Sequence, residues 1–504
     1  MKRLFKSYLW MVLMGSLAWV SCSDKEVGGT AGTSFDPSQP IVINDFYPDS
    51  GGIATPMIIT GKNFGNDTTG LALWYVDEDG GRHRGGLVSS NGDKLYCYVP
   101  AGLTYKRNIK LEVTRANGTD TIKGAGSRDF KYITQTAVTT IVGTQTSDAH
   151  ATKIDKLLTS NLSAPGYLCV DNENNIFIVQ HRFDDSFKAN GSDAFIECRD
   201  EKNENVGGMV LKADLKRDQI SILQVNSKKD EKINAPAYST LDGYEGVYVP
   251  DDNGRKYYSL LKAQGYAVHK QQFINPNGYA NLDESNWKYC FVINKNDQMI
   301  YSVMFKGQLI RINPKTRKAE LLLKRVGKDG PKGSGGSDAF CTFSPTQPNR
   351  LFISFTDAHQ IWYVDVDQLS DKDSLTYAGE PYAGEPYAGI SSFGTVNVTE
   401  GKGWEDGALK NAKFCYPRQM TFTKDGKLYI ADSGNHCIRM IDTTQGKNAR
   451  VTTPIGVPQS AGFHDGGVEL AKFNWPTGVA VSADGSTVYV ADSKNQVIRE
   501  LSIK

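Results

Sequence analysis

The sequence lacks an excess of charge of either sign. Among its 504 residues, Lys and Arg total 57 and Asp and Glu total 56. Proteins that bind nucleic acid usually present a strongly basic surface to the phosphate backbone. The balance therefore predicts that nucleic acid is not a partner.

The sequence also lacks the cysteine spacing of zinc sites. An odd number of cysteines follows Cys22, and no two of them form a CxxC pair; they are Cys97, Cys169, Cys198, Cys290, Cys341, Cys415 and Cys437. Several lie inside or beside apolar runs, where a thiol acts as a small hydrophobe. We therefore expect buried free cysteines, no metal site and no cofactor.

No apolar run near the N-terminus is long enough to span a bilayer comfortably. The stretch 9–20 follows the basic residues Lys2, Arg3 and Lys6 and ends at Val20-Ser21-Cys22. This ending resembles a bacterial lipobox, although Trp19 stands where that family usually has leucine. The resemblance implies that residues 1–22 are a lipoprotein signal peptide and that Cys22 is lipidated. The alternative is an ordinary signal peptide with a chance cysteine.

The residues after Cys22 are polar. The segment 23–26 resembles the acidic surface-export signal of Bacteroidetes lipoproteins. That resemblance implies an outer-membrane lipoprotein facing the cell exterior. Residues 23–38 are rich in Gly, Ser, Thr and charge, so we expect a flexible tether there.

Glycine and aromatic residues are abundant, with 50 Gly, 24 Tyr and 21 Phe, which favours an all-β protein. Residues 39–134 alternate short apolar strands with turn signals, which is typical of a small β-sandwich. The motif from Pro40 through Tyr47-Pro48 to Gly61-Lys62-Asn63-Phe64-Gly65 resembles the immunoglobulin-like IPT/TIG domain. Such domains serve mostly as spacers or interaction modules.

Residues 137–504 contain internal repeats. The segments 412–439 and 471–499 each have an apolar strand, an Asp-Gly turn, a second apolar strand and the sequence Ala-Asp-Ser. One copy cannot bury both of its faces, so copies must stack around an axis. The pattern resembles the NHL repeat of β-propellers. Degenerate copies at 165–180, 236–262, 291–305 and 343–362 bring the expected number of blades to six.

The chain stops after what would be the third strand of the last blade. Residues 137–144 resemble the outer strand that usually follows this repeat, so we expect them to complete that blade and remove an exposed edge. The predicted fold is thus all-β, an immunoglobulin-like (IPT/TIG) β-sandwich followed by a six-bladed NHL-type β-propeller.

Catalytic motifs are missing as well: the sequence has no GxSxG, HExxH or P-loop. The repeat position facing the channel carries a mixed set, namely Gln180, Met304, Phe355, Asp432 and Asp492. This set does not suit a ring of metal ligands. We expect the two aspartates, and His359 and His436 at another shared repeat position, to be structural.

Aromatic and basic residues cluster in the turns at one end of the predicted inner strands. The candidate ligand-binding residues are Tyr167, His181, Arg182, Phe183, Trp404, Tyr416, Arg418 and Trp475. Aromatic faces pack against sugar rings, and arginine binds hydroxyls or carboxylates. The alternative is that some of them, Trp475 especially, are hydrophobic plugs between blades.

These patterns favour a non-catalytic cell-surface lipoprotein that binds a glycan, with an acidic one favoured. It would support polysaccharide capture and uptake beside import proteins, as the resemblance to gut Bacteroidetes lipoproteins implies. Two alternatives remain: a propeller enzyme, either a polysaccharide lyase or a metal-dependent hydrolase, and a protein-binding scaffold.

Overall fold

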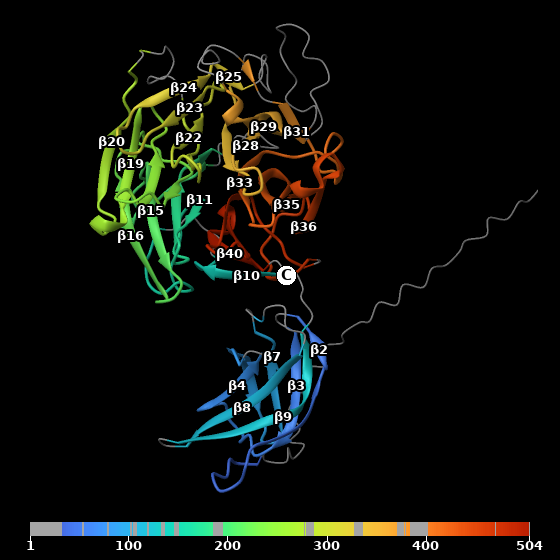
Figure 1. Ribbon diagram of the computed structural model, residues 1–504. Helices are drawn as coiled ribbons and strands as arrows, with labels where there is room; N and C mark the ends of the chain where they lie inside the picture. The colour runs from blue at the N-terminus through green and yellow to red at the C-terminus, as the bar shows by residue number, and fades with distance from the viewer. Residues whose placement is uncertain are drawn as a thin grey trace, which may run out of the picture. The chain divides into compact units, whose positions relative to one another are not determined.

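The computed structural model describes residues 33–52, 55–77, 80–100, 103, 108–117, 120–132, 137–145, 151–184, 195–276, 278, 287–326, 336–369, 377–378, 380–383, 402–468 and 470–502. The predicted signal peptide, Cys22 and most of the predicted tether lie outside these residues. The chain divides into two compact units, Met1–Ile133 and Thr134–Lys504, each described here by itself (Figure 1).

The first unit consists of two sheets around one hydrophobic core. One sheet has the order β1 (Val42–Tyr47), β3 (Pro56–Lys62), β7 (Lys94–Tyr98), β6 (Gly86–Ser90). The other has the order β2 (Ser50–Gly51), β9 (Asp120–Tyr132), β8 (Asn108–Asn117), β4 (Leu71–Val76), β5 (Arg82–Arg84). Strand alternation turns Ile59 of one sheet and Leu73 of the other into the shared core beside Phe130. The assignment to the IPT/TIG family remains a prediction.

The described residues of the second unit form six sheets of four or five strands, and within each sheet the hydrogen-bonded neighbours pair antiparallel. The first sheet consists of β11 (Pro165–Val170), β12 (Ile176–His181), β15 (Gly208–Asp214) and β16 (Gln219–Asn226), and the second of β17 (Ala237–Ser239), β18 (Gly246–Pro250), β19 (Lys256–Leu261) and β20 (Val268–Gln272). The third consists of β21 (Val292–Ile293), β22 (Ile300–Val303), β23 (Leu309–Ile312) and β24 (Ala319–Leu323), and the fourth of β27 (Ala339–Phe343), β28 (Arg350–Phe355), β29 (Gln360–Asp365) and β31 (Glu380–Ala383).

The last two sheets contain the clearest repeats. One consists of β32 (Gly407–Ala408), β33 (Pro417–Phe422), β34 (Lys427–Asp432), β35 (Cys437–Asp442) and β36 (Arg450–Ile455). The other consists of β10 (Ala137–Val142), β37 (Gly466–Gly467), β38 (Pro476–Val481), β39 (Thr487–Asp492) and β40 (Val497–Ser502). Two small pairs, β13 (Phe183–Asp184) with β14 (Phe195–Ile196) and β25 (Arg325–Val326) with β30 (Tyr377–Ala378), lie outside the six sheets.

Helical structure in the described residues is limited to short 3₁₀ segments. They are η1 (Lys262–Gln264), η2 (Thr356–Ala358), η3 (Val366–Gln368), η5 (Ser433–Asn435), η6 (Thr443–Asn448) and η7 (Ser493–Asn495). Three of them lie between equivalent strands of their sheets: η2 joins β28 to β29, η5 joins β34 to β35, and η7 joins β39 to β40. The all-β prediction is therefore confirmed.

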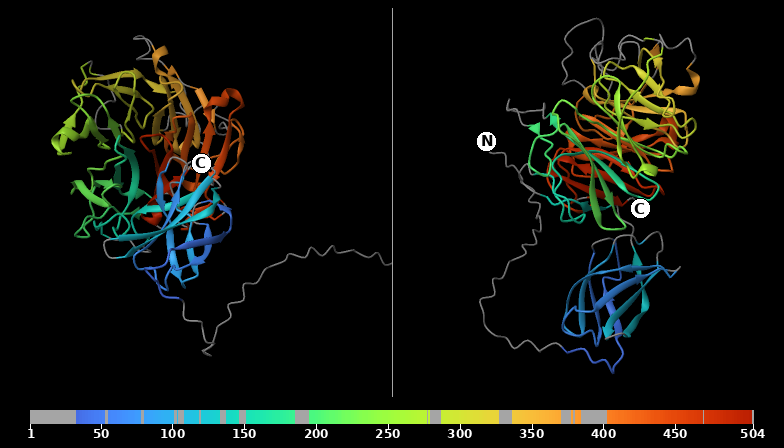
Figure 2. Two further views of the ribbon diagram at one scale, coloured as in Figure 1. Left: turned by 60° about the horizontal axis from the view of Figure 1, so that its bottom comes forward. Right: turned by 90° about the vertical axis from the view of Figure 1, so that its left-hand side faces the viewer.

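One end strand of each of the six sheets, here named the innermost strand, contacts the innermost strands of the neighbouring sheets, and together they form a closed circuit. β11 contacts β38, β38 contacts β33, β33 contacts β27, β27 contacts β21 and β22, β21 contacts β17, and β17 contacts β11. The chain passes round this circuit in sequence order, as the colours show in Figures 1 and 2. The second unit is thus a β-propeller whose innermost strands surround the axis.

The ring is closed by strands from both ends of the second unit. β10 pairs antiparallel with β40, with Ala137 opposite Ser502 and Val138 opposite Leu501. Thr140 also donates its backbone N–H to Asp465 Oδ2 at 3.0 Å. The prediction that residues 137–144 complete the last sheet is confirmed, and the pairing covers an edge that would otherwise be open.

Each of the last two sheets contains the same buried ion pair. Asp432 accepts from the Cys415 backbone N–H at 2.7 Å and from Arg439 Nη1 at 2.8 Å. Asp492 pairs with Arg499 in the same way at 2.7 Å, and all four charged side chains are fully buried. The prediction that these aspartates are structural is confirmed.

All seven cysteines after Cys22 are buried and free, as the apolar runs predict. Two of them, Cys290 just before β21 and Cys341 in β27, have their Sγ atoms 3.1 Å apart. Burial raises the pKa of the Cys341 thiol. These thiols fill space in the propeller core.

We expect Gly478→Ala to destabilise the propeller by about 1–3 kcal/mol, because it forces atoms into a packed interior. A Cβ at this position of β38 would lie 2.5 Å from the Gly166 carbonyl oxygen and 3.0 Å from Tyr167 Cα. Gly467→Ala, in the same sheet, is the control, since a Cβ there meets nothing within 4 Å. Denaturant unfolding measures both, and equal stability of the two variants would contradict the close approach of β11 and β38.

Candidate functional site

Side chains from three sheets meet near the propeller axis. Arg418 of β33 donates from Nη1 to the Tyr167 hydroxyl of β11 at 3.2 Å. The same Nη1 lies 4.0 Å from Asp338 Oδ2, just before β27. Arg418 is only 7 % exposed, and its Nε has no hydrogen-bond partner among the described residues. We name Tyr167, His181, Asp338, Phe340 and Arg418 the axial cluster.

A side chain of β33 also bonds to the backbone of β11, next to this cluster. Gln419 donates its side-chain amide to the Leu168 carbonyl at 2.7 Å and accepts from the Leu168 N–H at 3.0 Å. Its amide oxygen lies close to Gly478, whose lack of a side chain leaves the space it occupies. These two hydrogen bonds join β11 directly to β33. The strand β38 also contacts both of them.

An arc of aromatic rings runs through the axial cluster. The distances between successive ring centroids are Trp287–Phe305 4.8 Å, Phe305–Tyr289 6.2 Å, Tyr289–Phe340 6.3 Å, Phe340–Tyr167 5.0 Å and Tyr167–His181 4.9 Å. Most of these rings are buried or half-buried, whereas Trp287 is 38 % exposed. The aromatic arc therefore has one end in the buried axial cluster and one end open to solvent.

Asp338 is the titratable centre of the cluster. Burial, and then the neighbouring Asp357, raise the pKa of its carboxyl to about 7, against the opposing effects of Arg418 and a hydrogen bond from Tyr289. Its side chain keeps 23 % of its surface exposed. At neutral pH this carboxyl can therefore either donate or accept a proton.

His181 is a neutral member of the cluster. Burial, followed by the positive charges of Arg418 and Lys232, lowers the pKa of its imidazole to about 3. The pKa of the Tyr167 phenol is raised, mainly by burial. Neither group carries charge near neutral pH, so Arg418 and Asp338 dominate the electrostatics.

Tyr416 and Trp475, both predicted to bind ligand, are buried between sheets. They are 6 % and 7 % exposed, and they form a small apolar cluster with Cys415. Their backbone N–H groups donate to Nδ1 of His359 at 3.1 Å and of His436 at 3.0 Å. The two histidines are therefore structural, as predicted, and the two aromatic residues have the environment of packing between sheets.

Three further residues predicted to bind ligand, Arg182, Phe183 and Trp404, are not members of the axial cluster. Arg182 forms an ion pair with Glu197 at 3.5 Å. Phe183 lies in β13, opposite Ile196 of β14. Trp404, 41 % exposed, donates from its indole to Thr453 Oγ1 of the outer strand β36 at 3.0 Å.

The sequence brought Tyr167, His181 and Arg418 into the candidate set, and the structure places these three together. It also corrects their placement, because Tyr167, His181 and Arg418 lie inside β11, β12 and β33 and not in the turns beside these strands. The other main members of the site, Asp338, Phe340 and the Trp287–Tyr289 segment, were missed. Each lies in or just before the first strand of a degenerate repeat, which is the position that aromatic residues hold in the clear copies.

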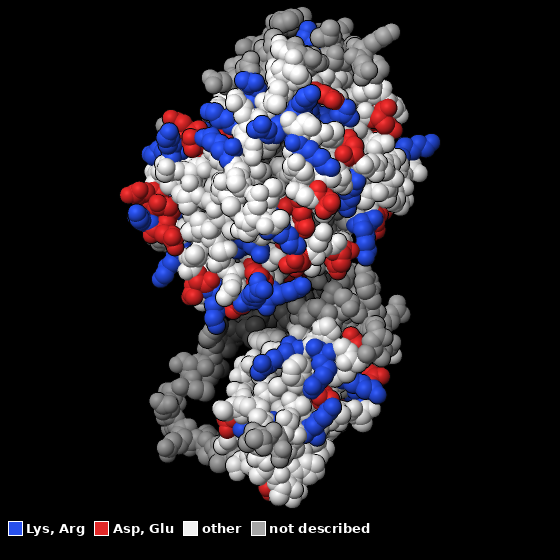
Figure 3. Space-filling view, turned by 60° about the vertical axis from the view of Figure 1, so that its left-hand side comes forward, with Lys and Arg blue, Asp and Glu red and all other residues white. Residues whose placement is uncertain are grey.

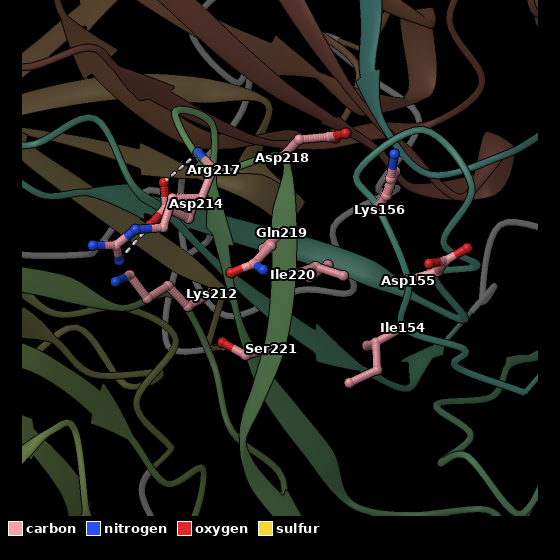
Figure 4. Close-up of a pocket in the computed structure, with 10 residues that line it drawn as sticks. All are labelled: Ile154, Asp155, Lys156, Lys212, Asp214, Arg217, Asp218, Gln219, Ile220 and Ser221. Atoms are coloured by element: carbon pink, nitrogen blue, oxygen red, sulfur yellow. Dashed lines mark hydrogen bonds and ion pairs between the residues drawn. The ribbon is translucent and has the colours of Figure 1, made fainter.

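A hollow of about 630 Å³ lies beside β15 and β16, away from the axial cluster, and is shown in Figure 4. Its lining alternates acid and base, with Asp214 and Arg217 paired at 3.3 Å. Asp218 accepts from the Leu157 N–H. The hollow contains no aromatic side chain and none of the residues predicted to bind ligand, so its chemistry suits a sugar less well than the axial cluster.

The face of the second unit that Figure 3 shows does not favour a partner with charge of one sign. Basic and acidic side chains are interspersed on the face of the second unit in Figure 3. In the part of the chain that the structure describes, no group of three or more His, Cys, Asp or Glu could hold a metal ion. No helix formed by those residues is both long and apolar enough to cross a membrane.

Comparison with protein families finds the NHL repeat at residues 414–439, which confirms that repeat prediction. NHL repeat-containing protein 2 of Gallus gallus is 35 % identical over 100 residues, a match that covers 20 % of this chain and 13 % of that protein. The chain therefore spans only a small part of that curated relative.

Solved structures from Bacteroides match over nearly the whole chain. An auxiliary nutrient binding protein of Bacteroides ovatus ATCC 8483 has a TM-score of 0.58 at 18 % identity, over 93 % of this chain and 99 % of that one. Another, from Bacteroides thetaiotaomicron VPI-5482, has 0.56 at 20 % identity over 93 % and 99 %. A putative phosphatase of the same strain has 0.57 at 18 % identity over 94 % and 99 %. At such identities the similarity concerns the fold.

Proposed function

We propose that this protein is a non-catalytic cell-surface lipoprotein that binds a glycan at the axial cluster of its propeller. The observation that carries the proposal is the aromatic arc beside Arg418 and Asp338. Aromatic rings pack against the apolar faces of sugar rings, and a guanidinium binds hydroxyl or carboxylate oxygens. The open end of the arc at Trp287 gives a ligand a first contact, and Arg418 favours an acidic glycan.

The names of the structural neighbours support a nutrient-binding role, since two of the Bacteroides proteins are auxiliary nutrient binding proteins. We propose that the chain supports polysaccharide capture and uptake beside import proteins of the outer membrane. In this proposal the six sheets are six NHL-type blades, and an IPT/TIG domain in residues 39–134 holds them away from the lipid anchor.

A glycan array probed with residues 38–504 tests the proposal and names the ligand. Retention of one class of polysaccharide, with acidic members retained best, is the expected result. An array with no glycan retained, alongside correctly folded protein, would contradict glycan binding and favour a protein-binding scaffold.

Trp287→Ala is expected to weaken binding of that glycan by about 2 kcal/mol, the loss typical of an aromatic anchor in a binding site. The fold should be retained, because 38 % of the Trp287 side chain is already exposed. Trp404→Ala is the matched control, since its indole is equally exposed but contacts the outer strand β36. Calorimetric titration measures affinity; a larger loss for Trp404→Ala would move the site away from the axial cluster.

A second function, a lyase or hydrolase acting on the same glycan, is favoured by one observation. The pKa of Asp338 is about 7, near the value suited to a general acid or base, and the phenol of Tyr289 hydrogen-bonds to it. Incubating the bound glycan with the protein and with Asp338→Asn distinguishes the two functions. Product release that depends on Asp338 would establish catalysis, and an unchanged glycan would support binding alone.

For the anchor, we expect Cys22→Ala to move the protein out of the membrane fraction, because the lipid would no longer be attached. Cell fractionation measures this, and protease treatment of intact cells reports whether the wild-type protein faces the exterior. Cys97→Ala, which changes a buried cysteine of the first unit, is the control and should leave fractionation unchanged. A Cys22→Ala protein that stayed in the membrane would contradict lipidation.

A further inference from the structure

A smaller hollow, of about 260 Å³, lies between the sheet β17–β20 and the turn that joins β23 to β24. It shares no residue with the axial cluster. Its lining consists of Tyr244, Tyr248, Tyr257, Ser259, Leu261, Gln271, Pro314, Lys315 and Arg317. The volume is below the ~300–1,000 Å³ of pockets for drug-sized ligands, so the occupant must be small.

The sheet presents its polar groups to the hollow because strand residues alternate between faces. Tyr257 and Ser259 are two apart on β19 and point to the same side. Tyr257 is paired with Gln271, and Ser259 with Tyr248, on the neighbouring strands. Two phenols, a hydroxyl and an amide therefore line one patch of the sheet.

The opposite side of the hollow is basic. Asn313 Oδ1 accepts from the Lys315 and Thr316 backbone N–H groups and fixes the turn. Arg317 Nη1 donates to Gln271 Oε1 at 3.4 Å, which brings the guanidinium to the sheet. Neither Lys315 nor Arg317 forms an ion pair with any described residue, and no Asp or Glu lines the hollow. The hollow thus has two positive charges that nothing in its lining neutralises.

The Tyr257 hydroxyl is the third polar group available to a ligand. The described residues give it no hydrogen-bond partner, although the ring is 1 % exposed and packs against Phe291 at 5.9 Å. Arg317 is close enough to lower the pKa of this phenol, against the larger raising effect of burial, and the resulting pKa is about 12. The hydroxyl therefore stays protonated and can donate to an anionic oxygen.

We infer that this hollow is a second binding site, for a single hydroxylated ring that carries one oxyanion group. Lys315 and Arg317 bind the oxyanion, the Tyr257 hydroxyl donates to it, and Ser259 and Gln271 contact ring hydroxyls. The carboxylate of a uronic acid and the sulfate of a sulfated sugar share this chemistry. The inference does not rest on glycan binding at the axial cluster.

The test is ligand-observed NMR titration of the complete chain with glucuronate, glucose 6-sulfate and glucose at constant ionic strength. We expect at least one anionic sugar to bind saturably and at least tenfold more tightly than glucose, and the tighter of the two identifies the oxyanion. Arg317→Asn and Tyr257→Phe should each weaken that binding at least tenfold. Asparagine suits position 317, because Arg317 has a left-handed φ of 61°.

Lys318→Ala is the matched control, because Lys318 is an exposed cation on the same hairpin that does not line the hollow. It should leave affinity unchanged. The inference is overturned if neither anion binds, if glucose binds equally well, or if the three variants behave alike. Binding lost in Trp287→Ala but kept in Arg317→Asn would place the anion at the axial cluster instead.

Discussion

Asp432→Ala is expected to destabilise the propeller by about 3–5 kcal/mol, because it leaves the buried guanidinium of Arg439 without its buried partner. Both side chains are fully buried, and Asp432 also accepts from the Cys415 N–H at 2.7 Å and from Asn435 Nδ2 at 2.8 Å. The change therefore leaves several buried donors unsatisfied, and of its ion pairs the guanidinium keeps the one with the half-exposed Asp406 at 2.8 Å. Chemical denaturation followed by intrinsic fluorescence measures the loss.

Asp425→Ala is the control for that variant. Asp425 lies on the β33–β34 hairpin of the same sheet, 53 % exposed, and pairs with Lys427 at 2.7 Å. Exposed pairs of this kind contribute about 0–1 kcal/mol. A similar cost for the two variants would mean that the Asp432–Arg439 pair does not hold the sheet together.

The stability of the wild-type protein relative to Asp338→Asn is expected to fall as pH rises from about 4 to about 7. Burial raises the pKa of Asp338 to about 7 in the folded chain, whereas an unfolded Asp titrates near ~3.9. Between these values the folded state holds a proton that the unfolded state has released, so each step up in pH favours unfolding. The difference between the folded and unfolded pKa values corresponds to a loss of unfolding free energy on the order of 4 kcal/mol over this pH range.

Comparison with Asp338→Asn isolates this effect, since asparagine has a similar shape and does not titrate. Unfolding free energies measured from pH 4 to pH 8 should converge in acid and separate near neutrality, with the variant the more stable at high pH. A constant difference at every pH would show that Asp338 titrates near its ordinary value. A wild type that gained stability with rising pH would show that Arg418 holds the carboxylate ionised.

Much of the propeller follows from the sequence alone. Two clear copies of the repeat, with Asp432 and Asp492 at the same position, predict the strands, the turn between them and a structural aspartate, because these features are local to about 30 residues. The closing strand could be predicted for the same reason, since residues 137–144 resemble the outer strand that is missing after the last repeat, 471–499. Burial of the cysteines followed from the apolar runs around them.

The axial site could be predicted only in part. Tyr167, His181 and Arg418 stood out as polar or aromatic residues beside repeat strands, but the same pattern selected Tyr416 and Trp475, which pack between sheets. A repeat position determines the strand on which a residue lies. The exposure of its side chain depends instead on which residues of the neighbouring sheets pack against it.

What the sequence by itself determined is therefore the repeating unit: a strand, a turn, a second strand and a structural aspartate. Only the tertiary structure decided which unlike residues meet at the axis. Arg418 and Tyr167 are 251 positions apart and touch because the ring closes, and Asp338 joins them from a third sheet. Repeats fix local geometry through short-range hydrogen bonds and burial. The site, in contrast, consists of positions at which the copies differ, and those residues come into contact only because the ring closes.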